Sequence, residues 1–507
     1  MEKFKEIAFS KIPIIVLLIL VQVVWFFLFF EKLRKHYAWV GTFFALLSII
    51  MFLAIIMSDQ NPSYKISWIV IIGLVPLLGG LLYLVFGNKR PSARLRKKIN
   101  KSKRNLADYY FQDQKILEKL PDRKRTTSNY ILNTGGYPVY DNTSVKYFKV
   151  GEQMYASMLE DLKKAKSFIF FEYFIVAESS MWEGIKEILL QKAEEGLEIR
   201  VMYDDMGCMG VLPKNLKKDL TAAGIKVMAF NPLVPFMSLV MNNRDHRKIL
   251  VIDGDIGYTG GINIADEYIN VNPPYGHWKD TGIKLQGEAV NNLTAMFLSI
   301  WNAYDSEELE SERYICSGLI EENSEYKGFV QPFSDSPLDN ETLSENIYMD
   351  IIWQAKDYVY IFTPYLIIDN EMTIALSMAA KRGVDVRIVV PGIPDKKIIY
   401  QLTQSYFKPL MRAGVKIYLY TPGFIHAKSY ISDDEIAVVG TINMDYRSLY
   451  LHFECGVLMM DTPCIKDIKK DYFEVFEESK LLELDDLKQG RMEDLLRATL
   501  RVVSPLL

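Results

Sequence analysis

Two copies of one short residue pattern are found in this 507-residue sequence, and their residue types suit phosphate chemistry. In each copy a lysine follows a histidine by two residues and an aspartate follows it by seven, with a glycine and an asparagine further on. Two of the five histidines of the chain open these copies, so the shared spacing is strong evidence for a common site. The copies are His246, Lys248, Asp253, Gly260 and Asn263, and His426, Lys428, Asp433, Gly440 and Asn443.

Residues of these types can transfer a phosphodiester group. One imidazole can attack phosphorus and form a covalent intermediate, which divides a difficult step into two easier ones. The second imidazole can protonate the leaving alkoxide and later deprotonate the incoming hydroxyl. We therefore expect His246 and His426 to meet at one site. Ammonium groups and amides can hold the phosphoryl oxygens, which gives four phosphate-binding residues: Lys248, Lys428, Asn263 and Asn443.

Acidic residues complete this candidate site. A carboxylate on the far ring nitrogen would fix the tautomer of each histidine. Glu454 is the candidate for one histidine, and Asp280 or Glu172 for the other. Asp253 and Asp433 are counted with the catalytic residues of the pattern, although their places at strand ends favour a structural role in tying down the loop after the motif.

Composition excludes several other classes of function. The net charge of −4 gives no global basic field, so we expect no nucleic acid as a partner. The four cysteines are scattered without a C-x-x-C pair, which indicates neither a zinc site nor a disulfide framework. We recognise no metal-ligand cluster and expect neither a metal nor another cofactor, while the oligomeric state stays unknown.

The two patterns lie inside a longer internal repeat. Ala223–Val227 is echoed by Ala413–Ile417, and Gly196–Met202 by Gly383–Val389. Apolar strand patterns alternate with helical spacing in each half, as at Phe168–Ile175 followed by the next helix. This order predicts an α/β fold, in which two α/β/α domains in pseudo-twofold arrangement bring the histidines together across their interface.

The first half carries about ten additional residues just before its histidine. Leu233–Met241 is apolar where a surface loop is normally polar. Two interpretations remain open for this segment. It is either a lipid-facing element at the rim of the site, with Arg244 meeting a second phosphate, or a core element between the repeats.

Three apolar runs open the chain, at Ile12–Phe30, Ala38–Met57 and Ile66–Phe86. Each could cross a hydrocarbon core of roughly 30 Å at about 1.5 Å per helical residue. Residues 88–104 carry nine lysines and arginines and no acid, which places the following chain on the cytoplasmic side. We therefore expect a multi-pass protein of the cell membrane with cytoplasmic catalytic domains.

These patterns set the expected boundaries. Near-helical apolar spacing after Asp486 predicts a terminal helix, for which packing onto the second domain is favoured over a place in the membrane interface. The expected parts are a membrane domain with three transmembrane helices (1–87), a basic juxtamembrane linker (88–130), a first catalytic domain (131–335), a second one (336–485) and a C-terminal amphipathic segment (486–507).

The repeated pattern resembles the H-x-K-x4-D signature of the phospholipase D superfamily, and the surrounding residues resemble its bacterial cardiolipin synthases. The resemblance extends to Gly440-Thr-Ile-Asn443 and to the terminal Ser504-Pro-Leu-Leu507. Two segments depart from that family. Where it usually has Trp-Arg-Asp-Thr-His, this chain has Trp278-Lys-Asp-Thr-Gly282, and where it usually has Asn-Phe-Glu, this chain has His452-Phe-Glu454.

This resemblance implies two phospholipase D-like domains and a phosphatidyltransferase. Two phosphatidylglycerol molecules would give cardiolipin and glycerol through a phosphatidyl-histidine, without metal or nucleotide. His246, from the N-terminal motif, would be the nucleophile. Phosphatidylglycerol and other membrane phospholipids are then the expected partners of a membrane-embedded enzyme. Two alternatives use the same residues: a phospholipase D with water as acceptor, and a membrane-tethered phosphodiesterase or nuclease.

Overall fold

The computed structural model describes residues 28, 31–32, 38–87, 93–107, 111–232, 243–305, 311–315, 327–339, 341–487 and 490–506. It divides the chain into two compact units, Met1–Asn88 and Lys89–Leu507. Apart from Leu28, the expected membrane helix at Ile12–Phe30 lies outside the described residues, as does the apolar segment Leu233–Met241.

In the first unit, the apolar run Ile66–Phe86 forms two helices, so the single helix expected there is wrong. Because Pro76 has no amide hydrogen and its ring clashes with the preceding turn, the helix breaks at this point. The second helix folds back on the first, and the rings of Trp68 and Tyr83 lie 5.3 Å apart. In the part of the chain that the structure describes, no helix has both the length and the apolar character needed to cross a membrane. The helices are α3 (Ala38–Ile56), α4 (Pro62–Leu74) and α5 (Pro76–Phe86).

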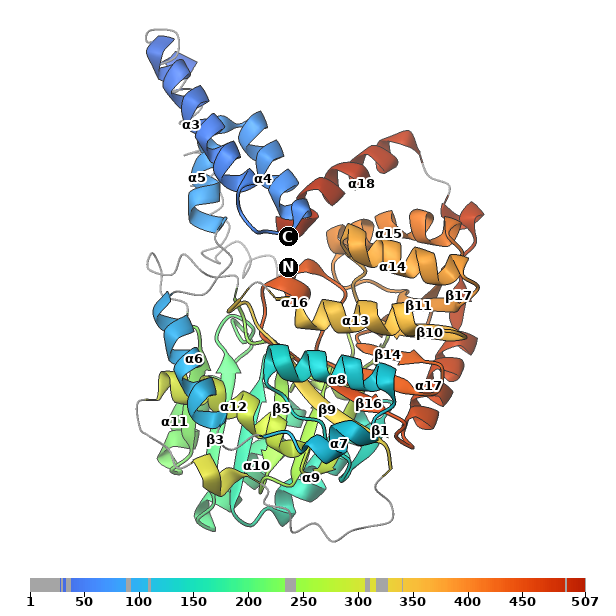
Figure 1. Ribbon diagram of the computed structural model, residues 1–507. Coiled ribbons are helices and arrows are strands. Elements are labelled where there is room, and N and C mark those ends of the chain that lie inside the picture. The colour runs from blue at the N-terminus through green and yellow to red at the C-terminus, as the bar shows by residue number, and fades with distance from the viewer. Residues whose placement is uncertain are drawn as a thin grey trace. The chain divides into compact units, whose positions relative to one another are not determined.

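Two sheets of matching topology build the second unit (Figure 1). The first has the order β1-β8-β6-β5-β2-β3-β4, and the second has the order β9-β16-β15-β14-β10-β11-β12 with β17 as an additional edge strand. The internal repeat of the sequence is therefore a repeat of topology. The first sheet contains β1 (Thr143–Phe148), β2 (Phe168–Tyr173), β3 (Glu198–Asp204), β4 (Lys226–Phe230), β5 (Lys248–Ile252), β6 (Ile256–Gly260) and β8 (Gly282–Gly287). The second contains β9 (Phe329–Asp335), β10 (Tyr358–Phe362), β11 (Asp385–Pro391), β12 (Lys416–Tyr420), β14 (Ser429–Ser432), β15 (Ile436–Gly440), β16 (Glu454–Met460) and β17 (Ser479–Leu481).

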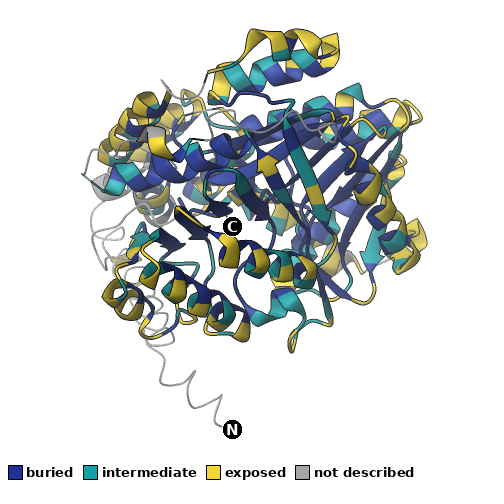
Figure 2. Cartoon of the chain, turned by 90° about the horizontal axis from the view of Figure 1, so that it is seen from below, coloured by how far each residue is buried: buried dark blue, intermediate teal, exposed yellow. Residues whose placement is uncertain are grey.

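Both sheets are mixed and are covered by helices, as expected for an α/β fold. Strands β2, β3 and β4 run parallel, as do β10, β11 and β12, whereas the remaining neighbours within each sheet are antiparallel. The strands are mostly buried and the outer faces of many helices are exposed (Figure 2). The repeated helices are α9 (Gly151–Lys164), α10 (Ser180–Glu194), α11 (Leu216–Ala222) and α12 (Val290–Tyr304), and α13 (Leu343–Gln354), α14 (Asn370–Lys381), α15 (Lys397–Arg412) and α17 (Ile465–Glu477).

The structure corrects two expected boundaries. Strand β9 pairs with β16 of the second sheet, although residues 131–335 were expected to form the first domain. The basic stretch is not a linker, because α6 (Ala93–Ala107) buries Ile99 and Leu106, and Ser102 donates to the Leu298 carbonyl of α12 at 3.4 Å. Most of its basic side chains are exposed, as expected for the polar face of an amphipathic helix. Two more helices follow, α7 (Gln114–Lys119) and α8 (Asp122–Gly135).

The expected terminal helix is present as α18 (Arg491–Val503), but its polar side is the one that packs. Arg497 is 7% exposed and donates to the side chains of Gln401 and Gln404 on α15, at 2.9 and 2.5 Å. Two apolar residues on the opposite side are open to solvent, with Met492 78% and Leu495 62% exposed. The helix thus attaches to the second half through hydrogen bonds and leaves an apolar face uncovered.

Candidate active site

Two backbone pairings between the halves bring the repeated motifs together. Strand β7 (His277–Lys279) lies parallel to β13 (Gly423–Ile425), and the amide of His426 donates to the Lys279 carbonyl at 2.7 Å. At the equivalent place in the other half, the amide of His246 donates to the Phe453 carbonyl at 2.9 Å. Each histidine therefore lies beside the residue that precedes an acidic side chain of the opposite half.

The acidic side chains complete a reciprocal exchange. Nδ1 of His246 lies 2.9 and 3.0 Å from the two carboxylate oxygens of Glu454, and Nδ1 of His426 lies 2.6 Å from Asp280 Oδ2. Both carboxylates are fully buried. Glu172, the alternative to Asp280, contacts neither histidine, because its carboxylate pairs with Arg247 at 2.8 Å.

This environment keeps both imidazoles neutral near pH 7. Burial lowers the pKa of His246 to about 3 and that of His426 to about 4. Burial raises the pKa of Asp280, but nearby Lys428 and His426 outweigh that effect and hold this pKa below its ordinary value. An ionised acid accepts a hydrogen bond from the Nδ1 proton of the ring, which leaves a lone pair on Nε2. Each histidine is thereby oriented for nucleophilic or basic chemistry.

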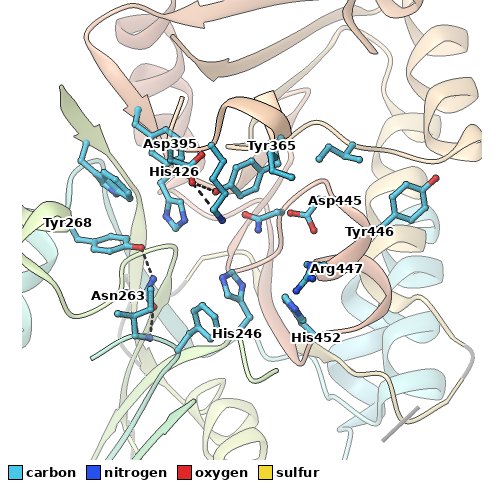
Figure 3. Close-up of a pocket in the computed structure, with 18 of the residues that line it drawn as sticks. His246, Asn263, Tyr268, Tyr365, Asp395, His426, Asp445, Tyr446, Arg447 and His452 are labelled. Carbon is cyan, nitrogen blue, oxygen red and sulfur yellow. Dashed lines mark hydrogen bonds and ion pairs between the residues drawn. The ribbon is translucent and has the colours of Figure 1, made fainter. Parts of the chain in front are cut away.

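The histidines open into one cavity of about 590 Å³ (Figure 3). This volume is of the size that holds small ligands in proteins. Both repeats contribute to the wall, which includes Asn263 and Asn443 together with aromatic side chains such as Trp278 and Tyr268. The apolar rings reduce access of water and strengthen charge interactions inside.

The two motif lysines are buried beside the cavity, and neither is among its lining residues. Nζ of Lys248 donates to the carbonyl of His246 at 2.6 Å, and Nζ of Lys428 donates to the carbonyl of His426. Burial lowers the pKa of Lys248 to about 8 and that of Lys428 to about 7. Their charge therefore depends on pH in a range where an ordinary lysine is always protonated.

Binding of a phosphodiester is expected to weaken as the pH rises through 7 to 8. Below these values both lysines are ammonium ions, and above them Lys428 and then Lys248 lose the charge that attracts the anion. If the bound anion raises the pKa of a lysine by one unit, losing that lysine's charge weakens binding about tenfold. The inhibition constant of glycerophosphoglycerol, which stays monoanionic throughout, can be measured from pH 5.5 to 9.5. A constant that is flat up to pH 9.5 would contradict the lowered lysine pKa values.

The two asparagines differ in their hydrogen bonds. Oδ1 of Asn263 accepts from the Ile175 amide at 3.1 Å, and its Nδ2 donates to the Tyr268 hydroxyl at 2.7 Å. Oδ1 of Asn443 has no hydrogen-bond partner within the described ranges. The pseudo-twofold symmetry of the motifs thus ends at the cavity wall, where the second asparagine keeps a polar atom available.

The motif aspartates are not at the cavity, which corrects their place among the catalytic residues. Asp253 has a left-handed backbone, with φ of 54°, and its carboxylate accepts from the amides of Lys166, Ser167 and Phe168 at 2.7–3.0 Å. Asp433, with φ of 53°, holds the start of β10 through three equivalent hydrogen bonds. Each aspartate secures the segment that precedes the neighbouring strand, and not the loop after its own motif.

Several cavity residues have no counterpart in the repeated pattern. Asp395 lies just beyond the end of β11 and accepts from the Tyr365 hydroxyl at 2.7 Å. Its position could have been found, because ligands of α/β sheets bind beyond the carboxyl ends of parallel strands.

Arg244, expected near a second phosphate, is buried and donates to the Asn231 carbonyl at 3.0 Å.

The described part of the chain contains one group of potential metal ligands, although we recognised no such cluster in the sequence. His246, His452 and Glu454 each offer one ligand atom, and these atoms lie within 4.8 Å of one another. His452 is a lining residue of the same cavity.

Comparisons with known proteins agree with this architecture. The family described as "Cardiolipin synthase, PLD-like domain" matches residues 158–301 and 348–478, which is more than half of the chain. A second family, described as "Phospholipase D-nuclease N-terminal", matches residues 42–88. The two long matches fall one on each half of the catalytic unit.

Individual relatives cover nearly the whole chain. An uncharacterized protein of Streptococcus mutans is 46% identical, over 90% of this chain and 99% of its own. The cardiolipin synthase of Halalkalibacterium halodurans is 33% identical, over 92% of this chain and 94% of its own. The crystal structure of the phosphatidylserine synthase of Haemophilus influenzae superposes with a TM-score of 0.56, covering 76% of this chain and 98% of that one at 14% identity, which is a likeness of fold.

Proposed function

Since the chain belongs to the cardiolipin synthase family with phospholipase D-like domains, we propose that it joins two phosphatidylglycerol molecules into cardiolipin and releases glycerol. The observation that carries this proposal is the reciprocal pair of histidine–carboxylate contacts at one cavity. Such a site can form and break a phosphorus–nitrogen bond without further groups.

In the first step, Nε2 of His246 attacks the phosphorus of one phosphatidylglycerol. The bond from phosphorus to the headgroup glycerol breaks, and the imidazolium of His426 gives its proton to the leaving alkoxide. The bound phosphodiester anion favours that imidazolium, since an opposite charge raises the pKa of a histidine. Lys248 and Lys428, whose ammonium groups donate to the backbone carbonyls of the two histidines, supply positive charge near the phosphoryl oxygens without lining the cavity.

In the second step, the released glycerol is replaced by a second phosphatidylglycerol. Neutral His426 takes the proton of its headgroup hydroxyl as that oxygen attacks phosphorus. The phosphorus–nitrogen bond breaks, which leaves His246 neutral and His426 protonated in the complex with cardiolipin. Asp280 stabilises the imidazolium of His426 in each cycle, because its carboxylate lies on Nδ1.

A test of this function uses the purified full-length protein with headgroup-labelled phosphatidylglycerol in mixed micelles, with products separated by mass. Equal amounts of cardiolipin and free glycerol are the expected result. Phosphatidic acid as the main product would instead assign a phospholipase D, in which water enters at the second step. Adding phosphatidylethanolamine tests whether the acceptor step is selective.

We place the enzyme at the cell membrane, with the N-terminal unit as its attachment and the catalytic unit on the cytoplasmic side. The apolar composition of residues 38–87 and the basic residues that follow support this arrangement. The uncovered face of α18 supports a second contact with lipid, since Met492, Leu495 and Leu496 are more than half exposed. Ser504, directly after α18, lines the cavity, so the C-terminal end of this helix lies at the cavity wall.

Replacing Leu495 and Leu496 together with glutamate is expected to reduce turnover of bilayer phosphatidylglycerol at least tenfold while leaving short-chain, dispersed phosphatidylglycerol unaffected. Each replacement removes the roughly 1.5–3 kcal/mol that burying a leucine side chain in the lipid interface contributes to binding. Proteoliposome and micelle assays on the same preparation give the comparison. Ala498→Glu is the control for added charge, because it places one glutamate on the flank of α18, and each single leucine-to-glutamate variant is compared with it. Equal losses in both assays would mean that the face has no lipid contact.

A further inference from the structure

His452 has an unusual environment for a histidine. Its side chain is 10% exposed, it lines the cavity, and neither ring nitrogen has a hydrogen-bond partner among the residues that the structure describes. Its backbone is fixed, because the His452 amide donates to the Arg447 carbonyl at 3.0 Å and the next residue pairs with the Arg244 carbonyl. A buried imidazole with two unsatisfied nitrogens carries a desolvation penalty that a ligand would remove.

Two other ligand atoms lie close to this imidazole. Oε1 of Glu454 is 3.8 Å from Nδ1 of His452, beyond hydrogen-bond length, and 2.9 Å from Nδ1 of His246. The two rings have centroids 5.7 Å apart. In Figure 3 they lie next to each other on one side of the cavity.

These separations are close to the ligand spacing of a tetrahedral metal ion, and all three ligand atoms lie within 4.8 Å of one another. Zinc binds imidazole nitrogen and carboxylate oxygen at about 2.0–2.2 Å, which places pairs of ligands roughly 3.3–3.5 Å apart. The two measured Nδ1–Oε1 distances lie on either side of that value. Glu454 is also held from behind, because the Thr441 hydroxyl donates to its Oε2. Such outer contacts orient a metal-binding carboxylate.

We propose that His246, His452 and Glu454 form an inhibitory site for a divalent transition-metal ion such as Zn²⁺. Two imidazoles and one carboxylate select such ions over Mg²⁺ and Ca²⁺, which prefer oxygen ligands throughout. A water molecule in the cavity completes the tetrahedron. The metal replaces the hydrogen bond between His246 and Glu454, so the site and the active arrangement exclude each other.

The metal ion would inhibit the reaction because it changes which ring nitrogen of His246 carries the proton. Neutral His246 has a single ring proton. This proton is on Nδ1 while Glu454 accepts a hydrogen bond from it. A metal ion on Nδ1 uses the lone pair of that atom, so the proton moves to Nε2. The atom proposed to attack phosphorus then has no lone pair to donate. No bond to substrate forms and no redox change takes place, so removal of the metal restores the enzyme.

The third ligand is a departure of this chain from the family that it resembles. The segment His452-Phe-Glu454 stands where the resemblance predicted Asn-Phe-Glu. His452→Asn removes one imidazole and keeps a polar side chain at this position. His277→Asn is the matched control, because it also removes an imidazole of the catalytic unit, one that contacts the Tyr420 hydroxyl at 2.8 Å outside the cavity.

The test has a binding arm and an activity arm on the full-length protein in detergent micelles. Zn²⁺ binding is measured by calorimetry after EDTA treatment, without substrate, and we expect His452→Asn to weaken it about tenfold or more while His277→Asn does not. In the activity arm, Zn²⁺ inhibits wild-type turnover and EDTA restores it, whereas Mg²⁺ and Ca²⁺ at the same concentration do not inhibit. His452→Asn is expected to need at least tenfold more Zn²⁺ for the same inhibition.

Each arm can overturn the inference. Equal Zn²⁺ affinity in wild type and His452→Asn, with melting temperatures that show both folded, would exclude the site. If His452→Asn is unfolded, His452→Gln takes its place in the same comparison. The activity arm rests on the proposed function, but the binding arm does not. A protein that makes phosphatidic acid and still binds Zn²⁺ through His452 would therefore contradict the proposed function and leave the metal site standing.

Discussion

Replacing His246 with asparagine is expected to reduce cardiolipin formation by about 10⁵-fold or more, because the covalent step then has no nucleophile. Losses near 10⁶-fold follow removal of a nucleophile that acts as one unit with its base. His246 is suited to this role, since burial keeps its pKa near 3 and its Nδ1 proton is held by Glu454. The rate is measured with labelled phosphatidylglycerol at saturating lipid.

The position of the covalent intermediate distinguishes the two histidines. Acid quench of the wild-type enzyme followed by peptide mass spectrometry is expected to find a phosphatidyl group on His246. His426→Asn should lose turnover but accumulate that intermediate when the donor has a good leaving group, because the second step then has no base. A label on His426 would exchange the two roles. His277→Asn, which removes an imidazole outside the cavity, is expected to keep full labelling.

Replacing Glu454 with glutamine is expected to reduce the catalytic rate constant by about 10³–10⁴-fold. In a serine protease, the equivalent change from acid to amide left the geometry intact but selected the wrong histidine tautomer, with a loss of about 10⁴-fold. Here the amide would donate to Nδ1 of His246 and drive the proton to Nε2. The change is nearly isosteric, and the hydroxyl of Thr441 can still donate to the side-chain oxygen.

A split between binding and catalysis separates this effect from a general loss of structure. Binding of glycerophosphoglycerol and the melting temperature should stay near their wild-type values while turnover falls. Glu267→Gln is the matched control, since Glu267 lines the same cavity and lies in a different element, Asp266–Ile269. If Glu454→Gln weakens ligand binding as much as turnover, Glu454 acts on the structure of the cavity and not on the tautomer.

The repeated spacing was sufficient to find the histidines, lysines and asparagines of the two motifs, because it can be read from the sequence without any knowledge of contacts. Partners across the fold were harder to predict. Glu454 lies 208 residues from His246, and no local pattern connects them. Glu172 was a reasonable alternative to Asp280, since its strand β2 lies next to β5 of the first motif. Its pairing with Arg247 depends on which side chains share a buried face, which sequence spacing does not reveal.

The N-terminal errors have a different origin. Hydropathy counts apolar side chains and ignores the backbone hydrogen bonds that Pro76 interrupts, so a helical hairpin was mistaken for one long helix. Charge dominated the interpretation of residues 88–104, although Ile99 and Leu106 recur at helical spacing among the basic residues. The packed face of α18 was predicted from its apolar residues, whereas Arg497 makes the contact through two glutamines.

The reciprocal contacts His246–Glu454 and His426–Asp280 also constrain how this chain can evolve. A gene that encoded one repeat alone would hold a histidine and an acid unable to serve each other, and its product would work only as a pair of identical molecules. Once the two copies are fused, a mutation in either half impairs the histidine of the other. Recombination that exchanges one half with a distant relative must therefore preserve both contacts, so the two halves diverge in sequence but are inherited as one catalytic unit.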